Sequence, residues 1–135
     1  MIAIDTNVLI RRLVRDDAVQ VAKADRLFDA QAEILVTDVV LAETVWTLAG
    51  KRYNVDKRSL VDVIMGLLRE PNVLFESRQV IWSALNDFDE ADRVDFADAL
   101  IVNKARATAD RTDRPYRGTY TFDKAVLALE GTVVM

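Results

Sequence analysis

Short apolar segments alternate with longer segments of helical periodicity along this chain. The apolar segments are residues 1–5, 33–37, 73–76, 120–122 and 132–135. The segments with helical spacing are residues 7–14, 17–31, 38–53, 56–70, 79–88, 94–109 and 124–129. This alternation predicts a parallel sheet with helices on both faces, because parallel strands must be joined by crossover connections. No repeat or linker divides the chain, so we expect one α/β domain over residues 1–135 with a short, mostly parallel sheet of about 4–5 strands.

The chain contains neither cysteine nor histidine. This absence excludes a disulfide scaffold, a zinc finger, a thiol nucleophile and a Ser–His–Asp triad. Any hydrolytic chemistry must therefore come from carboxylates, Lys, Arg, hydroxyls or a metal held by oxygen ligands.

The 22 acidic and 18 basic residues give a net charge of −4, which argues against a broad basic surface for nucleic acid. Most of the basic residues are Arg, which binds phosphate in a forked geometry that Lys cannot match. The longest apolar run, residues 125–129, is far shorter than the roughly 20 residues of a membrane span. The first residues carry no basic leader, so we expect no membrane association and a cytoplasmic location.

Three acidic residues stand in strongly apolar surroundings without a nearby basic residue. Asp5 ends an apolar segment, Glu43 lies in VVLAETVWTLA, and Asp98 lies in DFADALIV. A buried, ionised carboxylate without a partner costs several kcal/mol, so it must be paired, protonated or bound to a metal. Three such acids could converge on one hard cation at the carboxyl ends of parallel strands. The alternative is that each faces solvent or meets an Arg from elsewhere in the fold.

Four further residues are candidates for the same site. Asp123 follows the fourth apolar segment and precedes a short helix, which is also the place of an ordinary N-cap. Asp95 lies one helical turn before Asp98 and could be a second ligand, a helix-start residue or a competitor for the same role. Thr6 and Thr121 could orient the carboxylates by hydrogen bonding, although capping and strand propensity explain them equally well.

Rival motifs are incomplete in this sequence. Residues 87–98 are acidic like a calcium loop but have Ala91 and Asp92 where an oxygen ligand and a Gly are needed. The four Gly residues form neither a Walker A motif nor GxGxxG. The opening DTN has Asn7 where haloacid-dehalogenase-like phosphatases have their second Asp.

Four motifs closely resemble those of PIN-domain proteins of the VapC toxin type. They are IDTNVLIR, TDVVLAETVWTL, DFADALI and TYTFDKAV, which occur in the family's order and span nearly the whole chain. The resemblance implies a compact α/β fold around a parallel sheet. It also implies a Mg²⁺- or Mn²⁺-dependent endoribonuclease that cleaves RNA with a metal-activated water. Such a protein is usually the toxin of a type II toxin–antitoxin pair, a homodimer, and the partner of a cognate antitoxin.

Carried over residue by residue, the resemblance implies an acidic metal-binding and catalytic cluster of Asp5, Glu43, Asp98 and Asp123, with Thr6 as the hydroxyl beside the first acid. We expect these carboxylates to lie about 4–7 Å apart, as oxygen ligands around one or two Mg²⁺ ions would. Asp95 matches an acid that is common but not universal in the family. The loop at residues 110–118 is longer and more charged than the family pattern.

An acidic protein can still bind RNA, because a metal inverts the local charge and arginines can flank the site. The candidate RNA-binding residues are Arg11, Arg12 and Arg15 in the first helical segment and Arg111, Arg114 and Arg117 in the loop. A solvated surface, or a pair between Arg12 and Asp16, would explain these arginines equally well.

Apolar residues on the helices at 38–53 and 56–70, including Trp46, Met65 and Leu68, favour a homodimer, although they could instead pack the two helices together. Two other functions are open. One is a catalytically silent PIN-like module that binds protein or RNA. The other is a structure-specific DNA nuclease, for which the chain lacks the usual insertions.

Overall fold

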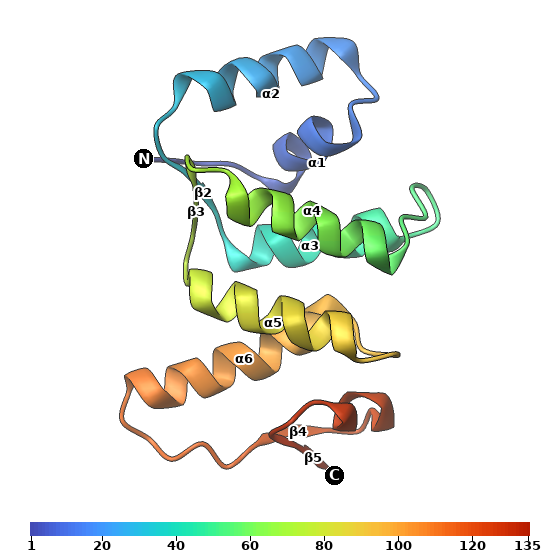
Figure 1. Cartoon of the computed structure of the whole chain (residues 1–135), viewed down its shortest axis with the longest axis vertical. Coiled ribbons are helices and arrows are strands. Elements are labelled where there is room, and N and C mark those ends of the chain that lie inside the picture. The colour runs from blue at the N-terminus through green and yellow to red at the C-terminus, as the bar shows by residue number, and fades with distance from the viewer. The chain divides into compact units, whose positions relative to one another are not determined.

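The computed structural model describes residues 1–135 (Figure 1). The chain forms two compact units, Met1–Arg78 and Gln79–Met135. The first unit contains β1 (Ile2–Ala3), α1 (Thr6–Val14), α2 (Ala18–Ala30), β2 (Ile34–Val36), α3 (Asp38–Ala49), α4 (Lys57–Arg69) and β3 (Val73–Phe75). The second contains α5 (Arg78–Glu90), which begins at the boundary, α6 (Phe96–Arg111), β4 (Thr119–Thr121), the 3₁₀ helix η1 (Lys124–Ala128) and β5 (Thr132–Val134).

The sheet of the first unit is parallel and has β2 in its centre. Ile34 of β2 pairs with Ile2 on one side and with Val73 on the other. Each crossover between these strands contains two helices, α1 with α2 and then α3 with α4. Because the strands are parallel, the residues that follow β1 and β2, among them Asp5 and Thr37, leave the sheet at the same ends of the strands.

Polar side chains start the helices of the first unit. Asp5, Asp17, Thr37 and Asp56 each accept a backbone N–H in the first turn of α1, α2, α3 and α4, respectively. These caps satisfy amide groups that have no partner within the helix. The sequence places apolar residues of α4 at helical spacing, and of these Leu60, Ile64, Leu67 and Leu68 are buried, whereas Val63 is only partly buried.

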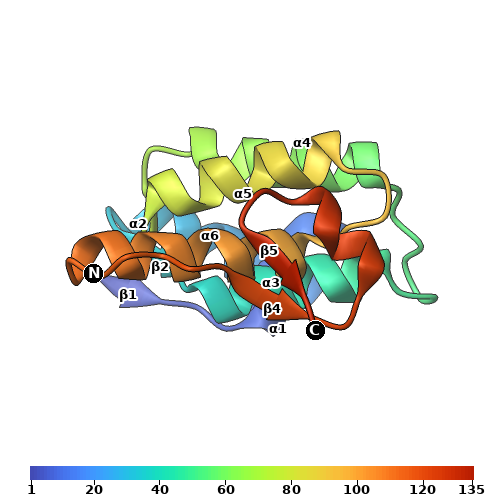
Figure 2. The ribbon, with the colours of Figure 1, turned by 90° about the horizontal axis from the view of Figure 1, so that it is seen from below.

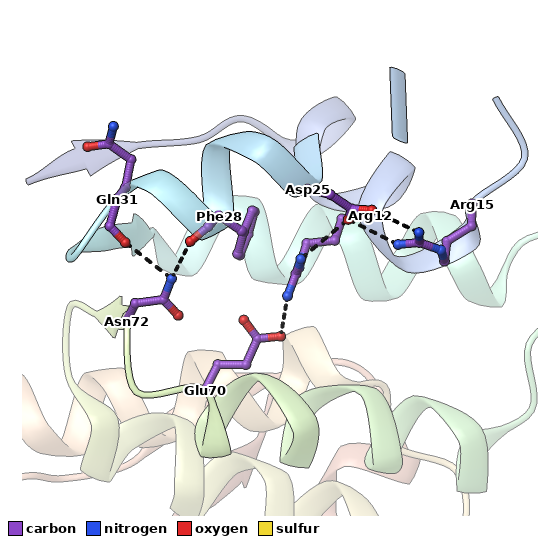
Figure 3. A network of polar contacts seen from close by, with 7 residues as sticks. All are labelled: Arg12, Arg15, Asp25, Phe28, Gln31, Glu70 and Asn72. Carbon is purple, nitrogen blue, oxygen red and sulfur yellow. Dashed lines mark hydrogen bonds and ion pairs between the residues drawn. The ribbon is translucent and has the colours of Figure 1, made fainter. Parts of the chain in front are cut away.

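Arg12 links three parts of the first unit (Figure 3). Its guanidinium lies 4.0 Å from the centre of the Phe28 ring in α2 and forms an ion pair of 2.9 Å with Glu70, the residue that ends α4. It also lies 3.5 Å from Asp25, whose carboxylate is held more closely by Arg15 at 2.8 Å. This network joins α1 to α2 and to the end of α4.

The second unit is built on α5 and α6. The rings of Phe88 and Phe96 meet edge to face, with centroids 5.9 Å apart. The buried Asn103 of α6 donates to the Asp87 carboxylate at 2.8 Å, which adds a polar link between the same helices. After α6, β4 and β5 pair in parallel, and Figure 2 shows them side by side.

The structure confirms the predicted α/β class, the parallel pairing and the order of helices and short strands. The five strands form one sheet of three and one of two, so neither sheet contains all the strands. The helix expected over residues 38–53 ends at Ala49, because Gly50 adopts an extended conformation. A single domain over residues 1–135 stays a prediction. No helix has both the length and the apolar character needed to cross a membrane.

Candidate active site

Asp5 lies two residues beyond the end of β1 and caps α1. Its Oδ1 accepts the backbone N–H of Val8 at 3.0 Å, and the side chain is exposed. The positive end of a helix stabilises a carboxylate at this position. The second oxygen, Oδ2, has no hydrogen-bond partner in the protein and is free to bind a cation or a ligand.

Glu43 is brought to the same place by the residue next to Asp5. The hydroxyl of Thr6 donates to Oε2 of Glu43 at 2.6 Å, across 37 residues of sequence. Packing of α1 against α3 allows this contact. The first unit therefore holds the Glu43 carboxylate against Thr6, the residue that follows Asp5 in the chain.

The exposure of these two acids corrects one step of the sequence argument. Both Asp5 and Glu43 are exposed, although the apolar character of their segments suggested burial. The reason for Glu43 is that α3 leaves one face uncovered, on which Val39 is 67% exposed and Trp46 is 76% exposed. Solvation thus accounts for the charge of each carboxylate without a basic partner.

Asp98 and Asp95 meet at the start of α6. Asp95 is the N-cap, and its backbone N–H donates to Oδ2 of Asp98 at 3.2 Å in a capping box. Asp98 is half-buried, and this burial raises the pKa of its carboxyl group. The Asp95 N–H opposes the rise, whereas the negative charges of Asp95 and Asp123 add to it. Asp95 is thus the helix-start residue as well as an acidic neighbour of Asp98.

Asp123 is the N-cap of η1, which is the ordinary capping role that its sequence position also allowed. Its Oδ1 accepts the N–H of Ala125 at 2.9 Å, and its own N–H donates to Oγ1 of Thr121 at 2.9 Å. Thr121 therefore fixes the turn that carries Asp123. The negative charge of Asp123 also adds to the raised pKa of Asp98, after the larger effect of burial.

The arginines of α1 and its C-cap are engaged in ion pairs. Arg11 contacts Asp16 at 2.9 Å, and Arg15 holds both oxygens of Asp25. The alternative pair of Arg12 with Asp16 is wrong, because Arg12 binds Glu70 and Asp25 instead. Arg15 adopts a left-handed conformation with φ 62°, and the chain reversal that it starts places Asp16 beside Arg11.

The loop arginines are less constrained. Arg114 donates to the carbonyl oxygen of Thr112 at 3.5 Å, and Arg117 is exposed. Arg111, predicted in the loop, is exposed but is the last residue of α6. Contact of these arginines with a phosphate backbone stays a prediction.

The acidic residues fit a hard divalent cation in chemistry, because every donor is a carboxylate or hydroxyl oxygen. Within each unit, however, no group of three or more acidic side chains is arranged so that it could hold a metal ion. Gathering of all four acids therefore stays a prediction.

A cavity of about 340 Å³ opens beside Asp5 between α1 and α2. Its polar lining includes Gln20 and Lys23, which the sequence argument did not single out. The only available signal was their place on the polar face of an amphipathic helix, where most residues are merely solvated.

Comparison with protein-family models matched the PIN domain family over residues 2–112, which is more than half of the chain. A search of curated proteins and a search of solved structures each found no match.

Proposed function

This chain belongs to the PIN domain family, and from that premise we propose that it is a Mg²⁺- or Mn²⁺-dependent endoribonuclease acting as the toxin of a type II toxin–antitoxin system. PIN domains are generally nucleases and typically use divalent metals, so the chain has a nuclease-type fold. The finer assignment draws on the likeness of its four motifs to VapC-type toxins.

The observation that carries the proposal is the hydrogen bond between Thr6 and Glu43. It holds a second carboxylate close to the N-terminal turn of α1, where Asp5 keeps one oxygen free. In the second unit, burial disfavours the ionised form of Asp98 and raises its pKa, and the charges of Asp95 and Asp123 add to this effect. A bound cation would relieve this repulsion, as expected of residues that share a metal site.

We assign the metal-holding role to Asp5, Glu43, Asp98 and Asp123. A divalent ion held there would activate water and neutralise the charge that develops on the scissile phosphate. Thr6 keeps the Glu43 carboxylate in one orientation, and the first turn of α1 does the same for Asp5. Thr121 supports the turn before Asp123. The match over residues 2–112 includes the first three acids but not Asp123, which rests on its sequence motif and on its effect on Asp98.

Cleavage of a labelled single-stranded RNA tests the activity. We expect cleavage with Mg²⁺ or Mn²⁺, none with EDTA, and a loss of about 100-fold or more in Asp5→Asn and Asp98→Asn. Asp56→Asn is the matched control for Asp5→Asn, because Asp56 also caps a helix through its carboxylate. Full activity in Asp5→Asn would refute the assignment of the site. Binding of RNA without any cleavage would favour the catalytically silent module.

Titration with Mn²⁺, followed by electron paramagnetic resonance, tests the gathering of the acids independently of activity. If residues of both units hold one site, Asp5→Asn and Asp98→Asn should each weaken Mn²⁺ binding by about tenfold or more. Asp56→Asn should bind like the wild type. Weakening by only one of the two variants would disprove a shared site.

The toxin role requires its own experiment. Induced expression of the wild-type chain in a bacterial host should arrest growth, whereas Asp5→Asn should not. Co-expression of the antitoxin from the neighbouring reading frame should restore growth. Absence of any growth effect from an active ribonuclease would separate the enzyme activity from the toxin role.

A further inference from the structure

The cavity between α1 and α2 lies entirely within the first unit. From α1 and the residue that caps it, Asp5, Asn7, Val8 and Arg11 contribute to the lining. From α2, the lining includes Gln20, Lys23, Ala24 and Leu27. Because Asp5 also belongs to the proposed catalytic cluster, anything that occupies this cavity lies directly beside that cluster.

The cavity wall is held in place by interactions across the turn between α1 and α2. Arg11 donates through Nε to Oε1 of Gln20 at 2.6 Å and pairs with Asp16 at 2.9 Å. The hydrogen bond to Asp16 raises the pKa of Arg11, so this guanidinium stays charged and paired. Arg15, the C-cap of α1, donates two hydrogen bonds of 3.0 and 2.8 Å to Asp25, which lies near the middle of α2. These contacts restrict the side chains of the wall, which lowers the entropic cost of filling the cavity.

The polar groups left available at the cavity differ from those that hold its wall. Arg11 is neutralised by Asp16, whereas Lys23 is exposed and has no ion-pair partner. The oxygen of the Gln20 side chain is used by Arg11, which leaves its amide nitrogen as a donor. Asn7 is exposed with its side-chain amide unpaired. One free cation and two amides thus border an apolar surface made by Val8, Ala24 and Leu27.

These groups match the parts of a single nucleotide. An apolar surface accepts the face of an unstacked base, amide groups bind base edges, and a lysine binds phosphate. The volume of about 340 Å³ falls within the roughly 300–1,000 Å³ typical of small-ligand sites. We propose that this cavity binds one nucleotide of the RNA strand next to the cleaved phosphodiester bond, with Lys23 on the phosphate and Asn7 and Gln20 at the base. The proposal rests on the proposed ribonuclease function.

The experiment measures binding and cleavage separately. Affinity for a fluorescent single-stranded RNA is measured by anisotropy in EDTA, where cleavage is excluded, and KM and kcat are then measured with Mg²⁺. Lys23→Gln should weaken binding and raise KM by about tenfold while kcat stays within about twofold. The salt dependence of binding should fall by about one phosphate contact. Lys23→Arg should retain the affinity, because it keeps the charge.

Lys51→Gln is the matched control, because Lys51 is an exposed lysine of the same unit that does not line the cavity. Equal RNA affinity in Lys23→Gln, Lys51→Gln and the wild type would overturn the proposal, even if the protein cleaves RNA, and would leave the cavity to a protein partner. If the wild type binds RNA without cleaving it, and Lys23→Gln alone weakens binding, the nucleotide site stands while the proposed activity fails. Absence of RNA binding by the wild type in EDTA, together with absence of RNA cleavage in Mg²⁺, would refute both.

Discussion

The Thr6 hydroxyl and the Glu43 carboxylate lie 2.6 Å apart and join the start of α1 to the middle of α3. Both side chains are at the surface, so the bond contributes little to folding and mainly restricts the rotamers available to Glu43. The preceding residue, Asp5, occupies the cap position of the same helix. The start of α1 thus supplies the Asp5 carboxylate and, through Thr6, orients the Glu43 carboxylate.

Thr6→Ala should impair activity through Glu43 and leave the fold intact. We expect the affinity for activating Mg²⁺ to fall about tenfold, as is typical when a partner that orients a metal ligand is removed. The free energy of unfolding should change by less than about 1 kcal/mol. Mg²⁺ dependence of RNA cleavage and urea denaturation measure the two effects. Thr6→Ser should restore activity, and Thr112→Ala, which removes a hydroxyl bonded only to backbone carbonyls of α6, should have no effect. Equal activity of Thr6→Ala and the wild type would show that Glu43 needs no such support.

The raised pKa of Asp98 predicts how Asp98→Asn alters stability with pH. The folded state binds the proton of Asp98 more tightly than the unfolded state does. Protonation of Asp98 therefore adds to the free energy of unfolding, and this addition is fully present below the ordinary Asp pKa. That contribution is lost as pH rises through the folded-state pKa. Asp98→Asn should therefore be at least as stable as the wild type at neutral pH, with a smaller advantage in acid. Urea denaturation of the wild type and Asp98→Asn, at neutral pH and at a pH below the ordinary Asp pKa, measures the difference in free energy of unfolding.

Asp25 offers a control of opposite sign. A hydrogen bond from Arg15 lowers the pKa of Asp25, so its contribution is present above the ordinary Asp pKa and is lost as pH falls through the folded-state value. Asp25→Asn should thus be less stable than the wild type at neutral pH, and the difference should narrow in acid. The same pH trend in both variants would contradict the assigned environments.

Local sequence signals predict most of the helices and strands here. The helix starts at Thr37 and Asp56 follow from capping chemistry, which involves only neighbouring residues. The apolar spacing in α4 identifies its buried face for the same reason, since periodicity is a property of the segment itself.

Contacts between distant segments are less accessible to such reasoning. Glu70 binds Arg12 across 58 residues, and no local pattern distinguishes Glu70 from the other surface acids. The exposure of Glu43 was also missed, because an apolar sequence around a residue does not reveal which face of α3 is covered. The candidate acids could be named from their motifs, but their partners and degree of burial required three-dimensional packing.

Arg12 should stabilise the fold rather than bind RNA. Its side chain is only 24% exposed, stacks on Phe28 and pairs with Glu70, so Arg12→Ala should reduce the free energy of unfolding by about 2 kcal/mol. Arg58→Ala should cost less than about 0.5 kcal/mol, because the Arg58–Asp62 pair is an exposed pair within one helix. Urea denaturation compares the two variants. A large rise in KM for RNA in folded Arg12→Ala, with unchanged stability, would return Arg12 to the RNA-binding residues.

The exposed apolar face of α3 favours self-association. Of the three residues that favoured a homodimer, Leu68 is buried in the first unit and Met65 is partly covered, whereas Trp46 is 76% exposed. Val39 lies two helical turns earlier on α3 and is 67% exposed, so the two form an apolar face around Glu43. Exposed tryptophan is a frequent centre of binding energy at protein interfaces. We therefore expect a homodimer that buries this face.

Trp46→Glu should then raise the dimer dissociation constant by about tenfold or more, because it places a charge in an apolar contact beside Glu43. Sedimentation velocity over a range of protein concentrations measures this change. Val19→Glu is the control, since Val19 is 66% exposed on α2 and lies outside this face. A wild-type monomer at high micromolar concentration would rule out the dimer. A dimer unaffected by Trp46→Glu would place its interface on another surface, and the exposed tryptophan would then be available for a different partner.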